Sequence, residues 1–300
     1  MKLLITNAWK YSKNDIDLLK SIGYECYFVE KENEPIPDTL LDVDGIVCNN
    51  LFLNTKPDAF RNLKLVQLTS AGLDRVPVDY FNSHNIKLFN ASGVYSIPIA
   101  EFVISSVLDL YKKKRIFYLN QEKRVWEKQR DLFELNNKNV CIVGCGSVGK
   151  ACAKLFNAFG CKVIGVDLSS FEDSCFEAII PIEQISTTLS VSDIVVIAVP
   201  LTKKTDGLFD RKLFSVMKST SILVNIARGK IIKTNDLIDA LDNKTISGAV
   251  LDVFENEPLD INSPLWKLEN VIVTPHNSFV GDGNEQRLSD LVKTNLEKQI

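Results

Sequence analysis

Short apolar segments rich in valine and isoleucine alternate with segments of helical period along most of the chain. Residues 14–22 and 235–241 place apolar side chains at helical spacing, whereas residues 194–199 form the continuous apolar run IVVIAV. Continuous runs are typical of central strands covered on both faces. The alternation predicts parallel sheets with helical crossovers, the α/β class. The expected strands are residues 3–6, 26–29, 45–48, 65–68, 87–89, 140–143, 162–166, 194–199, 221–225, 246–249 and 271–274.

A long helical pattern that starts after Pro98 separates two such α/β units. Apolar residues recur at helical spacing from Ile99 to Tyr111, and proline suits the first turn of a helix. A second helical pattern, residues 284–296, should pack back onto the first unit. The expected domains are residues 1–96 together with 280–300, and residues 97–279.

Composition supports a two-domain globular chain. The chain has 300 residues, which corresponds to about two domains at the usual ~150 residues each. Hydrophobic residues make up 45% and charged residues 24%, which excludes global disorder and a disulfide-stabilised miniprotein. The formal net charge of −3 argues against a nucleic-acid binder. The basic segment 112–130 fits a solvated surface, or the border of a subunit interface, better than a nucleic-acid patch.

Neither a membrane segment nor a metal site is expected. No apolar run approaches the ~20 residues that a helix needs to cross a bilayer. The start of the chain, MKLLITNAWK, has too short an apolar run for a signal peptide. The seven cysteines contain no C-x-x-C pair, which favours free thiols in the cytoplasm. With two histidines and no zinc-like spacing, we expect no metal.

A glycine-rich loop carries the clearest cofactor signal. Residues 139–143 (NVCIV) run directly into Gly144-Cys145-Gly146-Ser147-Val148-Gly149, and a helical pattern follows. Strand, loop and helix in this order bind the pyrophosphate of a dinucleotide, with free N–H groups at the helix start. Gly144 permits the tight turn, Gly146 lets the backbone approach the phosphates and Gly149 allows close helix–strand packing. The sequence therefore predicts a dinucleotide site.

The next expected strand leads into Asp167, the position of an acidic residue that binds the adenosine ribose. A 2′-phosphate ~4 Å away would be repelled by ~4 kcal/mol per unit charge at an effective dielectric constant of 20. Residues 168–171 contain no Arg or Lys to offset this repulsion, so we expect NAD rather than NADP. Cys145 is either a small side chain that fits the loop or a reactive thiol near a helix N-terminus.

The two histidines lie in different settings. His84 lies in a polar turn before a strand, which indicates a solvated turn residue. His276 follows the expected strand 271–274, at the carboxyl end, where catalytic groups collect in doubly wound folds. Arg228 and Glu257 follow two further expected strands. The three side chains together indicate a candidate active site.

Several segments, in order, resemble the D-isomer-specific 2-hydroxyacid dehydrogenase family over nearly the whole chain. They are residues 65–72 (LVQLTSAG), 98–101 (PIAE), the glycine-rich loop, 199–202 (VPLT), 224–229 (VNIARG), 251–258 (LDVFENEP) and 273–276 (VTPH). The resemblance implies a Rossmann-type cofactor domain and a flavodoxin-like substrate domain, with the active site in the cleft between them. It also implies a homodimer and the NAD-dependent interconversion of a 2-oxo acid and a D-2-hydroxy acid.

The same resemblance implies roles for individual residues. His276 would exchange a proton with the substrate oxygen, Glu257 would orient His276, and Arg228 would hold the 2-oxo acid. Backbone N–H groups around Ser70, Ala71 and Gly72 would bind the substrate carboxylate. Cofactor contacts would come from the glycine-rich loop and from Ser96, Ser147, Val148, Asp167, Pro200, Thr205, Ala227 and Asp252. The sequence departs from the family pattern at Asn277-Ser278, where a glycine-containing pair is usual.

The loop after residues 45–48, NNLFLN, is expected to face the substrate. It lacks Arg or Lys before Lys56, unlike the arginine-bearing loop of phosphoglycerate dehydrogenases that resemble this family. We therefore expect a small or apolar, non-phosphorylated substrate with Leu51 and Phe52 as wall residues; core packing is the alternative for both. Two other functions are open, a phosphoglycerate dehydrogenase and a non-catalytic NAD-responsive binding protein. The complete Arg/Glu/His set argues against the latter.

Overall fold

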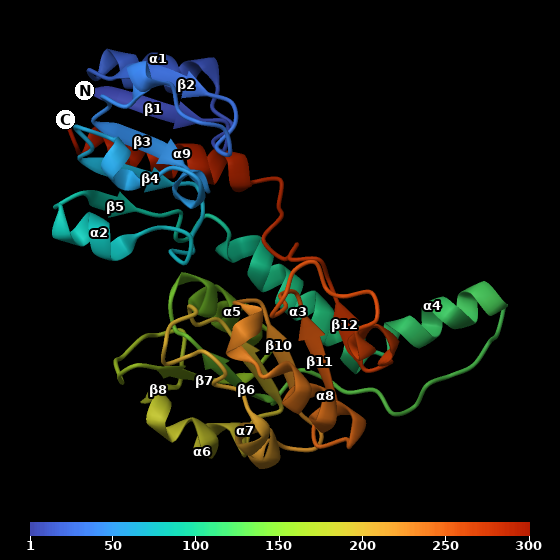
Figure 1. The fold of residues 1–300 in the computed structure, drawn as a ribbon. Coiled ribbons are helices and arrows are strands. Elements are labelled where there is room, and N and C mark those ends of the chain that lie inside the picture. Colours follow the sequence, from blue (N-terminus) through green and yellow to red (C-terminus); the bar gives the residue numbers. More distant parts are fainter. The chain divides into compact units, whose positions relative to one another are not determined.

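The computed structural model describes residues 1–300 and divides into two compact units, Met1–Tyr95 with Gly281–Ile300, and Ser96–Val280. Each unit is built on one parallel sheet with helices packed against it (Figure 1). The predicted α/β class is therefore confirmed. No helix combines the length and the apolar character needed to cross a bilayer.

The first unit has a five-stranded sheet with the order β2-β1-β3-β4-β5, which is the flavodoxin-like order. Its strands are β1 (Lys2–Thr6), β2 (Glu25–Val29), β3 (Gly45–Cys48), β4 (Leu65–Leu68) and β5 (Lys87–Phe89). Its helices are α1 (Lys13–Ser21), α2 (Val78–Ser83) and α9 (Asn284–Glu297).

Successive residues of β1 face opposite sides of the sheet, as the pleat of a strand requires. Leu3 and Ile5 pack in one buried cluster with side chains of α1 and α9. Leu4 packs in the cluster on the other side, which includes Phe81 of α2. Leu288, Val292 and Leu296 form the buried stripe of α9, so the C-terminal segment contributes to the core of the first unit.

A buried carboxylate also ties α9 to α1. Asp15 accepts hydrogen bonds from the Ser12 N–H (2.8 Å) and the Ser289 hydroxyl (2.7 Å), and it pairs with Lys293 at 3.0 Å. Burial raises the pKa of Asp15, but these hydrogen bonds and Lys293 outweigh burial and lower the pKa to about 2.

We expect Asp15→Asn to lower the free energy of unfolding at pH 7 by about 2 kcal/mol, because the pKa of this carboxyl falls on folding. The contribution is complete above the unfolded pKa of ~3.9 and is lost as the pH falls through about 2. Thermal unfolding of both proteins at pH 7 and pH 3 measures this contribution. The difference in stability between the wild type and Asp15→Asn should be smaller at pH 3. The exposed Asp17→Asn on the same helix is the control, with a change of ~0.5 kcal/mol or less. Equal losses in both variants would contradict the assignment.

The second unit has a seven-stranded sheet with the order β12-β11-β10-β9-β6-β7-β8. This is the Rossmann order with one strand added beyond the sixth. The strands are β6 (Asn139–Val143), β7 (Lys162–Asp167), β8 (Ala178–Pro181), β9 (Ile194–Ile197), β10 (Ile222–Asn225), β11 (Gly248–Leu251) and β12 (Val271–Val273).

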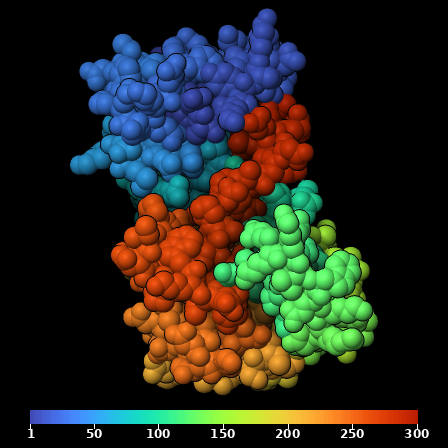
Figure 2. All heavy atoms as spheres, turned by 90° about the vertical axis from the view of Figure 1, so that its right-hand side faces the viewer, coloured from blue at the N-terminus to red at the C-terminus, as the bar shows by residue number.

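Helices cover both faces of this sheet (Figure 1). On one face α3 (Ser96–Tyr111) and α5 (Ser147–Ala158) pack against each other. The other face carries α6 (Ile185–Leu189), α7 (Arg211–Val216) and α8 (Thr234–Asp242), whose apolar residues join the largest buried cluster of this unit. α4 (Lys114–Lys123) extends from one end of the sheet, and with residues 124–134 it forms the arm, a green ridge on the surface (Figure 2).

Several elements differ from the prediction. β11 covers residues 248–251 instead of 246–249, and β9 ends at Ile197 instead of residue 199. α3 starts at Ser96, before Pro98, and ends at Tyr111. A second helix, α4, was not predicted, because Lys113 adopts a positive φ of 49° that breaks the helical path and no sequence pattern marks this break. The edge strand β8 was also missed, because it is short and only Ile179 in it is fully buried.

Candidate active site

The strand ends of the second unit are aligned. In the sheet register, Asn225 of β10 lies opposite Leu251 of β11, and Leu251 lies opposite Val273 of β12. The loops that follow these strands therefore leave the same edge next to one another. They carry the three predicted catalytic side chains, Arg228, Glu257 and His276.

Glu257 and His276 are in direct contact. His276 Nδ1 lies 2.8 Å from Glu257 Oε2, and the other carboxylate oxygen, Oε1, accepts the Phe254 N–H at 3.0 Å. Since a carboxylate only accepts hydrogen bonds, Nδ1 is the protonated nitrogen, and Nε2 is left to exchange a proton with a ligand. Both side chains keep solvent access, at 30% exposed for His276 and 38% for Glu257. The pair can orient a general acid or base.

The loop that holds His276 is fixed by the fully buried Asp252. Its carboxylate accepts the Thr274 hydroxyl (2.6 Å) and the N–H groups of Asn277 (2.8 Å) and Ser278 (3.0 Å). The Asp252 carbonyl accepts the His276 N–H at 2.8 Å, and His276 adopts a positive φ of 52°. Asp252 therefore positions the histidine loop. Asn277 and Ser278 contribute backbone N–H groups, so their departure from the family pattern leaves this geometry intact.

Arg228 is positioned by the buried Asn225 at the end of β10. The Asn225 side chain accepts the Ala227 N–H at 3.1 Å and donates to the Arg228 carbonyl at 3.0 Å. Arg228 Nη1 donates to the Ala227 carbonyl at 2.7 Å. Next to it, a Cβ at Gly229 would lie 1.8 Å from the Phe254 carbonyl carbon. This close approach joins the arginine loop to the loop that carries Glu257.

The glycine-rich loop has the geometry of a dinucleotide site. Gly144 has a φ of +103°, and a Cβ there would lie 2.6 Å from the Ala198 carbonyl carbon. A Cβ at Gly149 would lie 1.9 Å from the Gly144 carbonyl oxygen, so only glycine lets α5 pack this closely on the loop. Gly146 instead faces open space at the start of α5, with no atom within 4 Å of an added Cβ. The residues present therefore fit a bound pyrophosphate.

Asp167 lies at the end of β7, directly beside this loop. Its two carboxylate oxygens accept the N–H groups of Cys145 (2.8 Å) and Leu168 (2.7 Å), which fixes its orientation. The Cys145 thiol points away from the loop surface, since a Cβ at Gly165 would meet its Sγ at 2.4 Å. Burial raises the pKa of Cys145 to about 12. The structure supports the small-side-chain interpretation of Cys145 and opposes a reactive thiol.

The other predicted cofactor residues also lie at or near this edge. Thr205 is buried, and its hydroxyl donates to the Pro200 carbonyl at 2.7 Å, so it holds the turn after β9. Ala227 is buried, and Ser147 and Val148 begin α5. Ser96 begins α3 with a buried hydroxyl that has no hydrogen-bond partner.

The predicted substrate residues lie in the first unit. Ser70, Ala71 and Gly72 follow β4, where the Asn90 side chain donates to the Ala71 carbonyl at 2.8 Å. Leu51 is fully buried in the core, so its expected role as a substrate wall is not supported. Phe52 packs its ring against Phe60 and Phe81, with centroids 6.2 and 5.1 Å apart. Both side chains pack into the unit rather than toward a ligand.

Two positioning residues, Asn225 and Thr274, were not singled out from the sequence. A polar side chain at the end of an apolar strand is the signal that would have found Asn225. His84, which was assigned to a turn, caps the end of α2 and stacks on Tyr80 with the ring centroids 3.9 Å apart. It is a surface residue of the first unit.

Comparison with known proteins finds dehydrogenases and reductases that are similar to this chain. Residues 104–278 match the family model described as D-isomer specific 2-hydroxyacid dehydrogenase, NAD binding domain. A glyoxylate reductase of Thermofilum pendens is 35% identical over 249 residues, which cover 80% of this chain and 72% of that protein. A D-lactate dehydrogenase of Staphylococcus epidermidis is 30% identical, over 92% of this chain and 87% of that protein. The solved NADPH-dependent glyoxylate/hydroxypyruvate reductase of Sinorhizobium meliloti has a TM-score of 0.80 at 25% identity, over 98% of this chain and 93% of that one.

Proposed function

Because the chain belongs to the D-isomer-specific 2-hydroxyacid dehydrogenase family, an oxidoreductase family, we propose that His276, Glu257 and Arg228 carry the interconversion of a 2-oxo acid and a D-2-hydroxy acid. The 2.8 Å contact between His276 and Glu257 at the carboxyl edge of the nucleotide-binding sheet supports this most directly. It leaves Nε2 as the proton-exchanging atom.

Held by the glycine-rich loop and Asp167, a nicotinamide cofactor would supply the hydride that the carbonyl carbon accepts in the reductive direction. His276 gives the proton on Nε2 to the carbonyl oxygen, and the carboxylate of Glu257 stabilises the imidazolium that holds this proton beforehand. Arg228 holds the carboxylate and the carbonyl oxygen with its planar fork of N–H donors. The family resemblance implies that the N–H groups around Ser70, Ala71 and Gly72 bind the substrate carboxylate. In the oxidative direction His276 takes the proton back.

We test this function by following NADH oxidation with a panel of 2-oxo acids, namely glyoxylate, pyruvate, hydroxypyruvate and longer homologues. Turnover of a small, non-phosphorylated acid is the expected result. Efficient reduction of phosphohydroxypyruvate alone would favour a phosphoglycerate dehydrogenase. Tight NADH binding without turnover of any acid would favour an NAD-responsive binding protein and would overturn the proposal.

We propose NAD as the cofactor because of the position of Asp167. Its carboxylate is fixed by two backbone N–H groups at the end of β7, where it would accept hydrogen bonds from ribose hydroxyls and repel a 2′-phosphate. The Sinorhizobium meliloti relative is NADPH-dependent, so proteins with this fold differ in whether they use NAD or NADP.

We expect the wild type to use NADH at least ~100-fold better than NADPH in kcat/KM, since ~4 kcal/mol of repulsion is an upper bound for this contact. Asp167→Ala should weaken NADH binding by about tenfold and bring NADPH use to within about tenfold of NADH use. Steady-state kinetics with both cofactors measures kcat/KM, and fluorescence titration measures the two affinities. The exposed Glu172→Gln should leave both affinities unchanged. Equal use of the two cofactors by the wild type would rule out the role given to Asp167.

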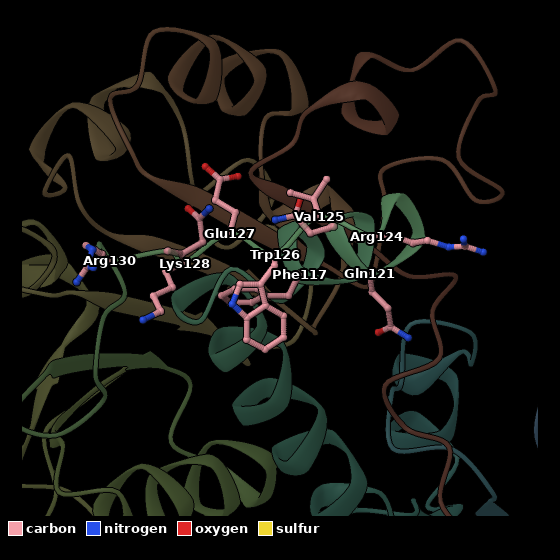
Figure 3. A pocket seen from close by; sticks show the side chains of 10 residues that line it. Phe117, Gln121, Arg124, Val125, Trp126, Glu127, Lys128 and Arg130 are labelled. Carbon is pink, nitrogen blue, oxygen red and sulfur yellow. The ribbon is translucent and has the colours of Figure 1, made fainter.

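We propose that the protein is a homodimer formed through the arm, residues 114–134. The arm exposes an unusual amount of apolar surface, with Trp126 at 96%, Tyr118 at 58% and Val125 at 47%. Phe117 and Trp126 line one hollow of the arm (Figure 3), and a second hollow of about 440 Å³ lies between the arm and the amino-terminal starts of β10 and β11. Exposed apolar patches of this kind mark interaction surfaces.

Trp126→Glu is expected to convert a dimer into a monomer, because it places a charge on the most exposed apolar side chain of the arm. Light scattering after size-exclusion chromatography at micromolar concentration measures the mass. Ile261→Glu is the matched control, since Ile261 is 87% exposed outside the arm. A monomeric wild type, or a dimer that survives Trp126→Glu, would contradict the assignment.

We also propose a reducing compartment, the cytoplasm. All seven cysteines are free thiols, and all except Cys26 are buried. Burial raises the pKa of Cys141, Cys152 and Cys161, so these thiols resist oxidation.

A further inference from the structure

A polar network lies at the carboxyl edge of the first unit's sheet. The Glu32 carboxylate, after β2, accepts the Thr6 hydroxyl (2.6 Å) and the N–H groups of Asn49 (2.7 Å) and Asn50 (2.6 Å). Arg75, in the loop after β4, donates from Nη1 to Asn50 Oδ1 at 2.9 Å. The network joins segments that follow four strands, and it places a guanidinium over the loop after β3.

This network changes the chemistry expected of the loop after β3. Two of its three apolar residues turn inward, since Leu51 is fully buried and Phe52 packs on two other rings, whereas Leu53 is 61% exposed. Asn49 and Asn50 remain toward the sheet edge, and the buried Asn49 Oδ1 has no hydrogen-bond partner. The loop itself lacks a basic residue before Lys56, but Arg75 brings positive charge to it from the loop after the neighbouring strand β4. The edge is therefore polar, with the Arg75 guanidinium on Asn50 Oδ1 and the Glu32 carboxylate on the backbone of the same loop.

Arg75 is close to the loop proposed to bind the substrate carboxylate. It follows Gly72 by three positions, so their Cα atoms lie within ~11 Å of each other even for extended chain. The arginine is exposed, and its bond to Asn50 uses Nη1 alone. An arginine has five N–H donors in a fixed fork, which suits bidentate binding of a carboxylate or phosphate. The charge of Glu32 is stabilised by its own three donors.

We propose that Arg75, oriented by Asn50, is a specificity-determining residue that binds an anionic group at the end of the substrate remote from its C1 carboxylate. This inference rests on the proposed function and refines its substrate class to 2-oxo acids with a second, terminal anion. That anion is a carboxylate or a phosphate, and both offer the oxygen pair that a guanidinium recognises.

The experiment compares kcat/KM for pairs of acids that differ only at the remote end. 2-Oxoglutarate is compared with 2-oxopentanoate and oxaloacetate with 2-oxobutyrate, which have the same number of carbon atoms, and 3-phosphohydroxypyruvate is compared with hydroxypyruvate, which lacks the phosphate. Each is measured with the wild type, Arg75→Gln and the control Arg61→Gln. Arg61 is an exposed arginine of the same unit that lies before β4, at the opposite edge of the sheet.

We call an acid with an anion at the remote end dianionic, and its partner without that anion neutral at the remote end. We expect the wild-type kcat/KM for at least one dianionic acid to exceed that for its neutral match by tenfold or more. Arg75→Gln should remove that preference by raising KM for the dianionic acid about tenfold, with kcat/KM for the neutral acid changed less than threefold. Arg61→Gln should behave as wild type. The preference should also weaken between 20 and 300 mM salt, because Arg75 is exposed. The carboxylate and phosphate pairs show which anion is selected.

Three results would overturn the inference. If the wild type reduces neutral 2-oxo acids but shows no preference for any dianionic match, or if Arg75→Gln changes both members of a pair equally, Arg75 does not select substrate while the proposed function stands. If the wild type reduces no 2-oxo acid, the proposed function fails and this inference fails with it.

Discussion

His276→Asn is expected to lower kcat for 2-oxo acid reduction by about 10²–10⁴-fold, the usual contribution of a positioned general acid. Asparagine can still hydrogen bond to Glu257, but it carries no proton that it can give to the substrate oxygen. NADH affinity should change less than threefold, because the glycine-rich loop and Asp167 lie on other strands. Single-turnover kinetics with NADH and a saturating 2-oxo acid, together with NADH titration, separate the two effects.

Asn277→Ala is the matched control for His276→Asn. Asn277 donates its backbone N–H to Asp252, and alanine keeps that N–H, so the loop should remain in place and kcat should stay within about threefold of wild type. If His276→Asn retained more than a tenth of the wild-type kcat, another group would have to supply the proton.

Arg228→Lys is expected to lower kcat/KM for the 2-oxo acid by about 10²–10³-fold, with both a higher KM and a lower kcat. Lysine keeps the charge but loses the planar fork that holds a carboxylate and a carbonyl oxygen together. The turn itself should survive, because Asn225 holds it through backbone groups at positions 227 and 228. Steady-state kinetics with the preferred acid measures the loss.

The control for Arg228→Lys is Arg211→Lys, an exposed arginine on α7 that pairs with Asp239. It should leave kcat/KM unchanged. If Arg228→Lys raised KM alone, by less than about fivefold, Arg228 would contribute ordinary ground-state binding rather than alignment of the reacting carbonyl.

The sequence was sufficient to predict the strands that carry the chemistry and the loops that follow them. Gly144 and Gly149 could be assigned because their roles depend on the backbone alone, and the structure shows the close approaches that exclude a side chain there. Glu257 and His276 could be paired through family resemblance, although 19 residues separate them.

Other features depended on which way a side chain turns, and the pattern does not encode this. Leu51 and Phe52 follow a buried strand and both pack inward, whereas the next residue, Leu53, is exposed. Arg75 reaches the loop after β3 from the loop after β4, so no local pattern relates it to Asn50. Asp252 was expected to contact the cofactor, but its carboxylate is occupied by three donors of the histidine loop.

The second unit is one uninterrupted stretch of chain, whereas the first is split around it. All three proposed catalytic side chains fall inside the stretch, and Arg75 and the loop after β4 fall in the flanking parts. In the proposed function, the central stretch specifies the hydride chemistry, and the N-terminal flank, which contains Arg75 and the loop after β4, specifies which acid is accepted. Substitutions in that flank are therefore expected to change the substrate without changing the reaction.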